Sequence, residues 1–209
     1  MRVSELLGVL LAGGLARRMG GGDKGLLPLA GSTILDHVIG RLRPQLAHLM
    51  INANGDADRF RRFGLPVRGD AVTGFVGPLA GVLTGMRHAE AALPAVTDIV
   101  TVPTDGPFVP RDLVRRLAAA REAAGATLAV ASSGGRTNPV VGLWPVRLAG
   151  ELERALVHEK ISKVDVWTAR YPIVAVEFAS DPVDPFFNCN TPQDLAEAER
   201  LLAAERNAS

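Results

Sequence analysis

The chain has a single cysteine, few aromatic residues and almost no net charge. Because Cys189 stands alone among 209 residues, an internal disulfide and a multi-cysteine metal site are both excluded, which suits a reducing compartment. Aromatic residues make up 5% and the net charge is +1, so no basic, aromatic face for nucleic acid is indicated. No apolar run approaches the ~20 residues of a membrane-spanning helix. We expect a cytoplasmic protein that binds neither nucleic acid nor membrane.

Apolar runs alternate with helical patterns along the chain. Strands that alternate with helices form crossover connections, so the pattern predicts an α/β fold with a Rossmann-like, mainly parallel sheet and helices on both faces. The predicted strands are Leu6–Leu11, Leu49–Ile51, Pro66–Arg68, Ile99–Val102, Thr127–Ala131, Val140–Trp144 and Ile173–Phe178. The predicted helices are Ile34–Leu42, Leu79–Ala92, Leu113–Ala124, Leu148–Val157 and Pro192–Ala204. We expect one domain over residues 1–204, a loop at residues 132–139 and a frayed tail at residues 205–209.

A glycine-rich, basic segment follows the first predicted strand, where residues 10–25 read LLAGGLARRMGGGDKG. Gly13 and Gly14 lack a Cβ, so their backbone N–H groups can approach an anionic ligand closely. Arg17, Arg18 and Lys24 add positive charge that could neutralise a phosphate. The segment therefore predicts a phosphate-binding loop, with a flexible surface loop as the alternative.

Two common phosphate-binding motifs do not describe this segment. A P-loop requires Ser or Thr after its lysine, whereas Gly25 follows Lys24. The stretch GGGDKG matches G-x-G-x-x-G only formally, because it lies several residues beyond the strand and would begin a helix poorly.

Polar residues follow several of the predicted strands. In open α/β sheets ligands bind outside the carboxyl ends of the strands, which directs attention to Gly13, Asn52, Asp70 and Asp105. Asp105 could hold Mg²⁺, which in turn binds triphosphate oxygens, or it could simply form a turn before Gly-Pro. From its position alone, Asp70 is better interpreted as an ordinary loop or cap carboxylate.

The glycine-rich segment resembles the signature of nucleotidyltransferases, and it is most similar to that of the molybdenum cofactor guanylyltransferases. Further matches occur in the family's order over nearly the whole chain: INAN at 51–54, RGD at 68–70, GPLAGVLTGM at 77–86, PTDGPFVP at 103–110 and NCNTPQDL at 188–195. Gly106 departs from the family, which usually has Thr after the aspartate.

The resemblance implies a fold like that of the nucleotide-diphospho-sugar transferases and a defined reaction. GMP passes from GTP to molybdenum-molybdopterin, which gives molybdopterin guanine dinucleotide and pyrophosphate. Mg²⁺ is the implied metal, with Mn²⁺ able to substitute. A monomer is expected, with transient contacts to proteins that deliver the acceptor or receive the finished cofactor.

The resemblance also assigns residues to the reaction. The catalytic residues are expected to be Arg18, Lys24 and Asp105, and Asp105 is also the expected metal ligand. The expected GTP-binding residues are Leu11, Ala12, Gly13, Gly14, Lys24, Asn52, Asp70, Gly77 and Asp105. The expected molybdopterin-binding residues are Arg136, Lys160, Lys163, Asn188 and Asn190, although solvated surface charge stays an alternative for the three basic ones. Cys189 is expected to be buried rather than nucleophilic.

Other activities of similar chains remain open. Cytidylyltransferases for the same cofactor typically have Ala-Ala-Gly where this chain has Ala12-Gly13-Gly14, so the sequence favours GTP. Sugar-phosphate nucleotidyltransferases are usually longer, with additional domains. A nucleotide-binding regulator without activity is disfavoured by Lys24 and Asp105.

Overall fold

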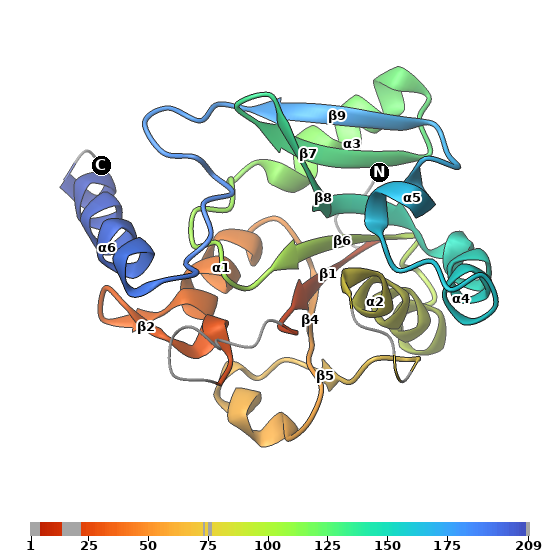
Figure 1. The fold of residues 1–209 in the computed structure, drawn as a ribbon, viewed down its shortest axis with the longest axis horizontal. Coiled ribbons are helices and arrows are strands. Elements are labelled where there is room, and N and C mark those ends of the chain that lie inside the picture. Colours follow the sequence, from red (N-terminus) through yellow and green to blue (C-terminus); the bar gives the residue numbers. More distant parts are fainter. Residues whose placement is uncertain (1–4, 14–21, 73, 75–76, 208–209) are drawn as a thin grey trace.

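The apolar runs form a seven-stranded sheet in a computed structural model, which describes residues 5–13, 22–72, 74 and 77–207 (Figure 1). The strand order across this sheet is β5-β4-β1-β6-β8-β7-β9. The strands are β1 (Leu6–Leu11), β4 (His48–Asn52), β5 (Val67–Arg68), β6 (Asp98–Pro103), β7 (Leu128–Ser133), β8 (Arg136–Pro145) and β9 (Ile173–Phe178). A separate ribbon pairs β2 (Pro28–Leu29) with β3 (Ser32–Thr33).

The sheet is mainly parallel, as predicted. β1 pairs in parallel with β4 and β6, β4 pairs in parallel with β5, and β7 does so with β9. Only β8, among these seven strands, runs against both of its neighbours. The LLGVLL run of β1 is buried over nearly its whole length, because helices cover the sheet on both sides.

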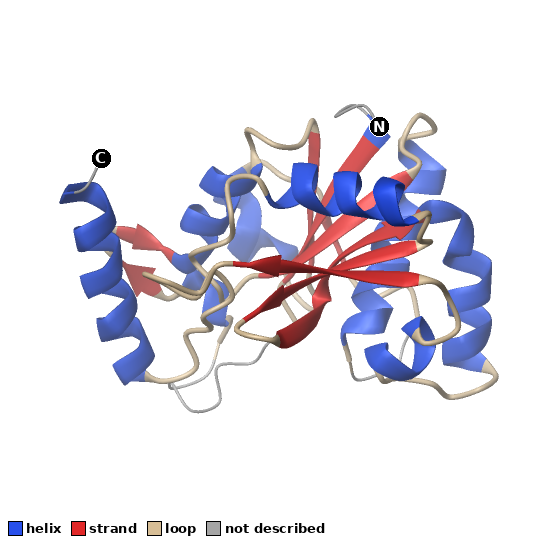
Figure 2. Ribbon diagram, turned by 90° about the horizontal axis from the view of Figure 1, so that it is seen from above, coloured by secondary structure: helices blue, strands red, loops and turns tan. Residues whose placement is uncertain are grey.

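Helices pack on both faces of the sheet (Figure 2). One face carries α1 (Ile34–Leu42), the 3₁₀ helix η4 (Ala57–Phe63) and α3 (Leu113–Ala124). The other carries α2 (Pro78–Ala92), η5 (Val146–Leu148), α4 (Ala149–Val157) and α5 (Val164–Thr168). Helix α6 (Pro192–Asn207) packs beside the β2–β3 ribbon, and η3 (Lys24–Leu26) precedes that ribbon. Within the described ranges, no helix has the length and apolar character needed to cross a membrane.

The predicted loop at residues 132–139 is wrong over most of its length. The structure continues β7 to Ser133 and begins β8 at Arg136, so only Gly134 and Gly135 form the turn. Both glycines have positive φ, 54° and 74°, and such a two-residue turn matches the twist of paired strands. The sequence pattern missed this hairpin because polar residues occupy both strands near the turn.

The last helix extends beyond its predicted end. Helix α6 continues to Asn207, so residues 205–207 are helical where a frayed tail was predicted. Tertiary contacts explain the extension, because Leu202 is buried and Glu205 forms an ion pair with Arg41 of α1. Helices η4 and α5 were not predicted, because both are too short for a helical period to be recognised.

Helix α2 packs directly on the middle of the sheet. A Cβ on Gly85 would lie 2.4 Å from Cγ2 of Val9 in β1 and 3.1 Å from Cδ1 of Ile99 in β6. Glycine is therefore the residue that lets this helix contact the strands so closely. The contact holds the first turn of α2 beside the carboxyl ends of β1 and β4.

We predict that Gly85→Ala destabilises the protein by about 1–3 kcal/mol, because the new methyl group overpacks the helix–sheet contact. Gly40→Ala is the matched control, since Gly40 also lies inside a helix but a Cβ there would meet no atom of the described residues within 4 Å. That change should stabilise the protein by about 0.5–1 kcal/mol. Urea unfolding of the two variants measures both effects, and equal stabilisation by both would contradict the packing argument.

Candidate functional site

Four parallel strands end side by side at one edge of the sheet. Leu11 pairs with Asn52 of β4 and with Pro103 of β6, and Asn52 pairs with Arg68 of β5. The segments that follow these strands enclose a cavity of about 460 Å³, within the ~300–1,000 Å³ typical of small-molecule sites. The cavity is lined by Leu11, Gly13, Lys24, Asn52, Asn54, Asp70, Gly77, Pro78, Pro103, Thr104, Asp105 and Val140.

Most of the residues predicted to bind a nucleotide line this cavity. They are Leu11, Gly13, Lys24, Asn52, Asp70, Gly77 and Asp105. Ala12 instead lies buried beneath it, and its N–H donates to the Asn52 carbonyl at 2.9 Å. Gly14 and Arg18 fall outside the described residues. The fold thus brings these predicted residues together in one cavity, although Leu11 and Asp105 are 94 positions apart in the sequence.

An amide–carboxylate network forms one end of the cavity. Asn52 Nδ2 donates to Asp70 Oδ1 at 3.0 Å, and Asn54 Nδ2 donates to Asp70 Oδ2 at 2.7 Å. The Asp70 N–H in turn donates to Asn54 Oδ1 at 2.8 Å. The carboxylate is therefore held in one orientation, while each of its oxygens keeps acceptor capacity for a ligand. Asn54 was not predicted as a site residue, although it stands in the same INAN segment as Asn52.

Helix α2 supports this network through a second glycine. A Cβ on Gly81 would lie 2.3 Å from Asn52 Oδ1 and 2.6 Å from Cδ2 of Leu11. A larger residue at this position would displace Asn52 from Asp70. Gly81 therefore contributes to the site because its lack of a side chain leaves room for Asn52.

A lysine and an aspartate form the opposite end of the cavity, because Asp105 follows β6, and the strand order places β4 and β1 between β6 and the β5 strand that precedes Asp70. Lys24 Nζ lies 3.4 Å from Asp105 Oδ2 and also donates to Asn190 Oδ1. These two charged side chains are 19% and 18% exposed, so their attraction is only partly screened by water. The pair places one positive and one negative group at the edge of the cavity.

The start of α6 holds Asn190 in place. The N–H groups of Asn190 and Thr191 both donate to Asp194 Oδ2 at 2.8 Å, and the Asp194 N–H donates to Thr191 Oγ1 at 3.2 Å. The reciprocal bonds between Thr191 and Asp194 form a capping box at the start of the helix. Burial opposes ionisation of Asp194, but these hydrogen bonds and the nearby Lys24 charge lower its pKa. Helix capping is thus coupled to the position of Lys24.

Asp105 has the chemistry of a metal ligand. Its Oδ1 atom is buried and has no hydrogen-bond partner among the described residues. An unpaired buried carboxylate oxygen is costly unless a cation or donor satisfies it. Mg²⁺ is commonly held by one or two carboxylates together with substrate phosphates, so this single oxygen fits such an ion. The described residues contain no group of three metal-ligating side chains.

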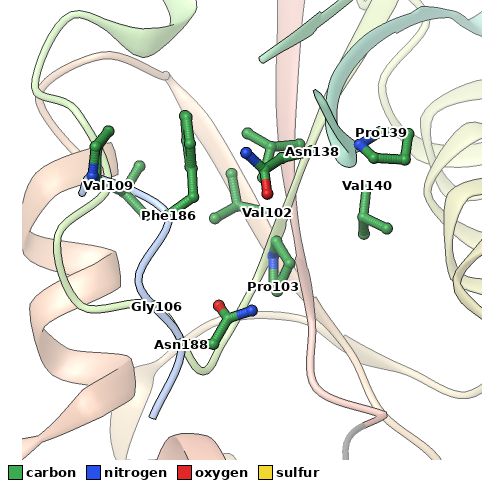
Figure 3. A pocket seen from close by; sticks show the side chains of 11 residues that line it. Val102, Pro103, Gly106, Val109, Asn138, Pro139, Val140, Phe186 and Asn188 are labelled. Carbon is green, nitrogen blue, oxygen red and sulfur yellow. The ribbon is translucent and has the colours of Figure 1, made fainter. Parts of the chain in front are cut away.

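A smaller cavity of about 140 Å³ adjoins the first one (Figure 3). Pro103 and Val140 line both cavities, while Asn138 and Asn188 face the smaller one together with apolar side chains such as Phe186. Asn188, a predicted acceptor residue, therefore lies beside the nucleotide-sized cavity but not in it.

Two local features shape the smaller cavity. The pairing of β7 with β8 shifts between Val130 and Ala131, opposite the stretch from Asn138 to Gly142, where Pro139 cannot donate to the ladder. A Cβ on Gly106 would lie 3.3 Å from Asn188 Oδ1. The glycine that departs from the family pattern thus permits close approach of Asn188.

The three basic residues of the predicted acceptor site line neither of these two cavities. Arg136 begins β8 opposite Ser133, at the exposed end of the hairpin. Lys160 and Lys163 flank Ser162, whose carbonyl would lie 3.3 Å from a Cβ on Gly77. Their segment therefore reaches the margin of the larger cavity, whereas Arg136 belongs to a different part of the sheet edge.

A solved structure shows the class of this fold. The molybdopterin-guanine dinucleotide biosynthesis protein A of Archaeoglobus fulgidus superposes with a TM-score of 0.75, over 95% of this chain and 99% of that one, at 24% identity. This likeness shows a shared α/β fold, in which ligands bind outside the carboxyl ends of the strands, where the larger cavity lies.

Sequence comparison then shows the particular family. The MobA-like NTP transferase domain matches residues 8–171. A molybdenum cofactor guanylyltransferase of Bradyrhizobium sp. (strain ORS 278) is 57% identical over 198 residues, which cover 95% of this chain and 93% of that protein. A second one, from Nitrobacter hamburgensis, is 54% identical and covers 95% of both chains. The chain belongs to the MobA-like NTP transferase family, the family of the molybdenum cofactor guanylyltransferases, which confirms the resemblance seen in the sequence.

Cys189 lies close to the site, in surroundings that disfavour its action as a nucleophile. Its side chain is fully buried, and its N–H donates to the Asp105 carbonyl at 2.8 Å. Burial, followed by the charges of Asp194 and Asp105, raises the pKa of its thiol to about 12. The thiolate required for attack is therefore nearly absent at neutral pH.

We predict that a thiol reagent at pH 8 leaves Cys189 of the folded protein unmodified over hours. The same reagent should modify the residue fully within minutes in urea, because unfolding restores an ordinary, exposed thiol. With a reagent that releases a coloured product when it reacts with a thiol, absorbance measures both modification rates. The sample in urea serves as the control. Rapid modification of the folded protein would show that the thiol is neither buried nor suppressed.

Proposed function

We propose that this protein transfers GMP from GTP to the terminal phosphate of molybdenum-molybdopterin, with release of pyrophosphate. The observation that carries the proposal is that one cavity holds the Asp70 network at one end and the Lys24–Asp105 pair at the other. A purine base needs hydrogen-bonding groups and a triphosphate needs positive charge or a bound metal ion, and the two sets of groups must be separated along one cavity. The guanylyltransferase names of relatives that share more than half of this sequence support the same donor and acceptor.

The Asp70 network supports guanine or guanosine recognition. A carboxylate can accept from the N1–H and the 2-amino group of guanine, two donors that cytosine does not present together. A site built to satisfy those donors rejects a base that lacks them. No atom of the described residues lies within 4 Å of a Cβ on Gly13, which lines the cavity, so a side chain there would take up ligand space.

The opposite end supports triphosphate binding. Lys24 and the N–H groups of Gly13 and the first turn of α2 would stabilise charge on the α-phosphate and on the departing pyrophosphate. Gly14 and Arg18 are proposed for the same task. Asp105 would hold Mg²⁺, or Mn²⁺ in its place, through the oxygen that has no protein partner among the described residues. When bound there, the metal ion would neutralise triphosphate charge.

The acceptor needs positioning more than it needs a base. A phosphate monoester has a second pKa of about 6, so it is mostly ionised at neutral pH and can attack without a general base. We place its approach at the smaller cavity, where Asn188 borders the Pro103 wall shared with the nucleotide cavity. Asn190, Arg136, Lys160 and Lys163 are proposed to contact it further out. In-line attack then depends on holding two anions together.

We further propose that the protein works in the cytoplasm as a monomer that contacts cofactor-delivery and recipient proteins only transiently.

We predict that Lys24→Ala and Asp105→Ala each lower the rate of GMP transfer by about 10²–10³, because each removes a group that stabilises charge in the transition state. Pyrophosphate release measures the rate. Asp112→Ala is the control, since Asp112 is a surface carboxylate paired with Arg115 and should leave the rate unchanged. Near-normal turnover by either site variant, with an unchanged circular dichroism spectrum, would contradict its assigned role.

We predict that pyrophosphate release requires GTP and molybdenum-loaded molybdopterin together. GTP alone should give no turnover, and CTP with the acceptor should give at most a few per cent of the GTP rate. Preference for CTP would identify a cytidylyltransferase instead, while turnover with a sugar phosphate would point to a different acceptor class. Binding of GTP without turnover under all conditions would indicate a nucleotide-binding regulator.

A further inference from the structure

One arginine outside the cavity contacts the segments that form both of its ends. Arg59, in η4, donates through Nε to Asp23 Oδ2 and lies 3.4 Å from Asp23 Oδ1 through Nη2. The same Nη2 donates to the Asn54 carbonyl at 2.6 Å, and Nη1 donates to the Asp56 carbonyl. All three guanidinium nitrogens are therefore engaged.

The guanidinium is held rigidly in this place. It lies over the ring of Phe60, with 4.7 Å between Cζ and the ring centroid, and Phe60 itself is fully buried in the core. Arg59 and Asp23 are 27% and 12% exposed, so their ion pair is partly shielded from water. A planar guanidinium fixed by stacking and by a carboxylate is a stiff connector, unlike a flexible surface pair.

Each partner of Arg59 leads directly to one end of the cavity. Asp23 immediately precedes Lys24, which pairs with Asp105. Asn54 makes two hydrogen bonds to Asp70. Arg59 and Asp23 do not line the cavity themselves, so the arginine acts on the ligand only through these neighbours.

We propose that Arg59 is a positioning residue that sets the separation between the lysine end and the aspartate end of the nucleotide cavity. The inference rests on the proposed function, because a nucleoside triphosphate must contact both ends at once. Simultaneous contact is effective only when the two ends are held at the spacing of the ligand, as for any two linked binding groups. Loss of Arg59 should leave the contacts within each end intact, but the two ends would no longer be held at a fixed separation.

Calorimetric titrations with GTP, guanosine and inorganic triphosphate, all with Mg²⁺, test the proposal on the full chain. For Arg59→Ala we expect GTP to bind about tenfold more weakly or worse, because the bridging advantage is lost. Guanosine and inorganic triphosphate each contact one end, so their affinities should stay within about threefold of wild type. Disruption of the site as a whole would instead weaken the binding of all three ligands alike.

Arg62→Ala is a matched control from the same 3₁₀ helix. Arg62 also forms an ion pair, with Asp36 at 2.6 Å, and also lies over an aromatic ring, that of Phe63 at 4.3 Å. Its partners belong to the start of α1 and do not line the cavity. Arg62→Ala should therefore leave the affinity for GTP unchanged while it removes comparable surface interactions.

The partner of Arg59 gives a second test. Asp23→Ala should weaken GTP binding in the same direction, and the double variant should lose no more than about threefold beyond Arg59→Ala, because the two changes break one connection.

Four results would overturn the proposal. Unchanged GTP affinity in Arg59→Ala, or equal losses for all three ligands, would exclude the positioning role while leaving the proposed function intact. Fully additive losses for the two residues would show that they act separately. A wild-type protein that does not bind GTP would overturn the proposed function as well.

Discussion

The register of β1 between β4 and β6 is the constraint on which the site depends. Because Leu11 stands opposite both Asn52 and Pro103, the segments after three strands leave the sheet at one level. Close packing of α2 on these strands, through Gly81 and Gly85, then brings the first turn of that helix to the same edge. A shift of one residue in this register would separate Asn52, Gly13 and Asp105 and remove the cavity.

The site that we propose for a polyanion must be built locally, because the chain has a net charge of only +1. Here the lysine is balanced by Asp105 and held by Asn190, whose own position depends on the capping box of α6. The C-terminal helix therefore serves the site although it packs outside the central sheet. The same hydrogen bonds stabilise the start of α6 and position Asn190, so a substitution at Thr191 or Asp194 would affect both the helix and the site.

The regular elements were largely predictable because strong local signals define them. The period of apolar residues marked Ile34–Leu42 and Leu113–Ala124, and a continuous apolar run marked β1. The β7–β8 hairpin was missed because its ends are polar and its turn depends on two glycines with positive φ. The extension of α6 was missed because Glu205 is stabilised by Arg41, a partner 164 residues away.

The sequence by itself determined the α/β class, the family, and the strand-end residues Asn52, Asp70 and Asp105, since each follows a recognisable strand or motif. Tertiary structure alone decided which polar groups meet: Asn54 with Asp70, Asn190 with Lys24, and Arg59 with Asp23. Local patterns encode which face of an element is buried. They do not encode hydrogen bonds between side chains on distant elements, because those contacts depend on how the elements pack.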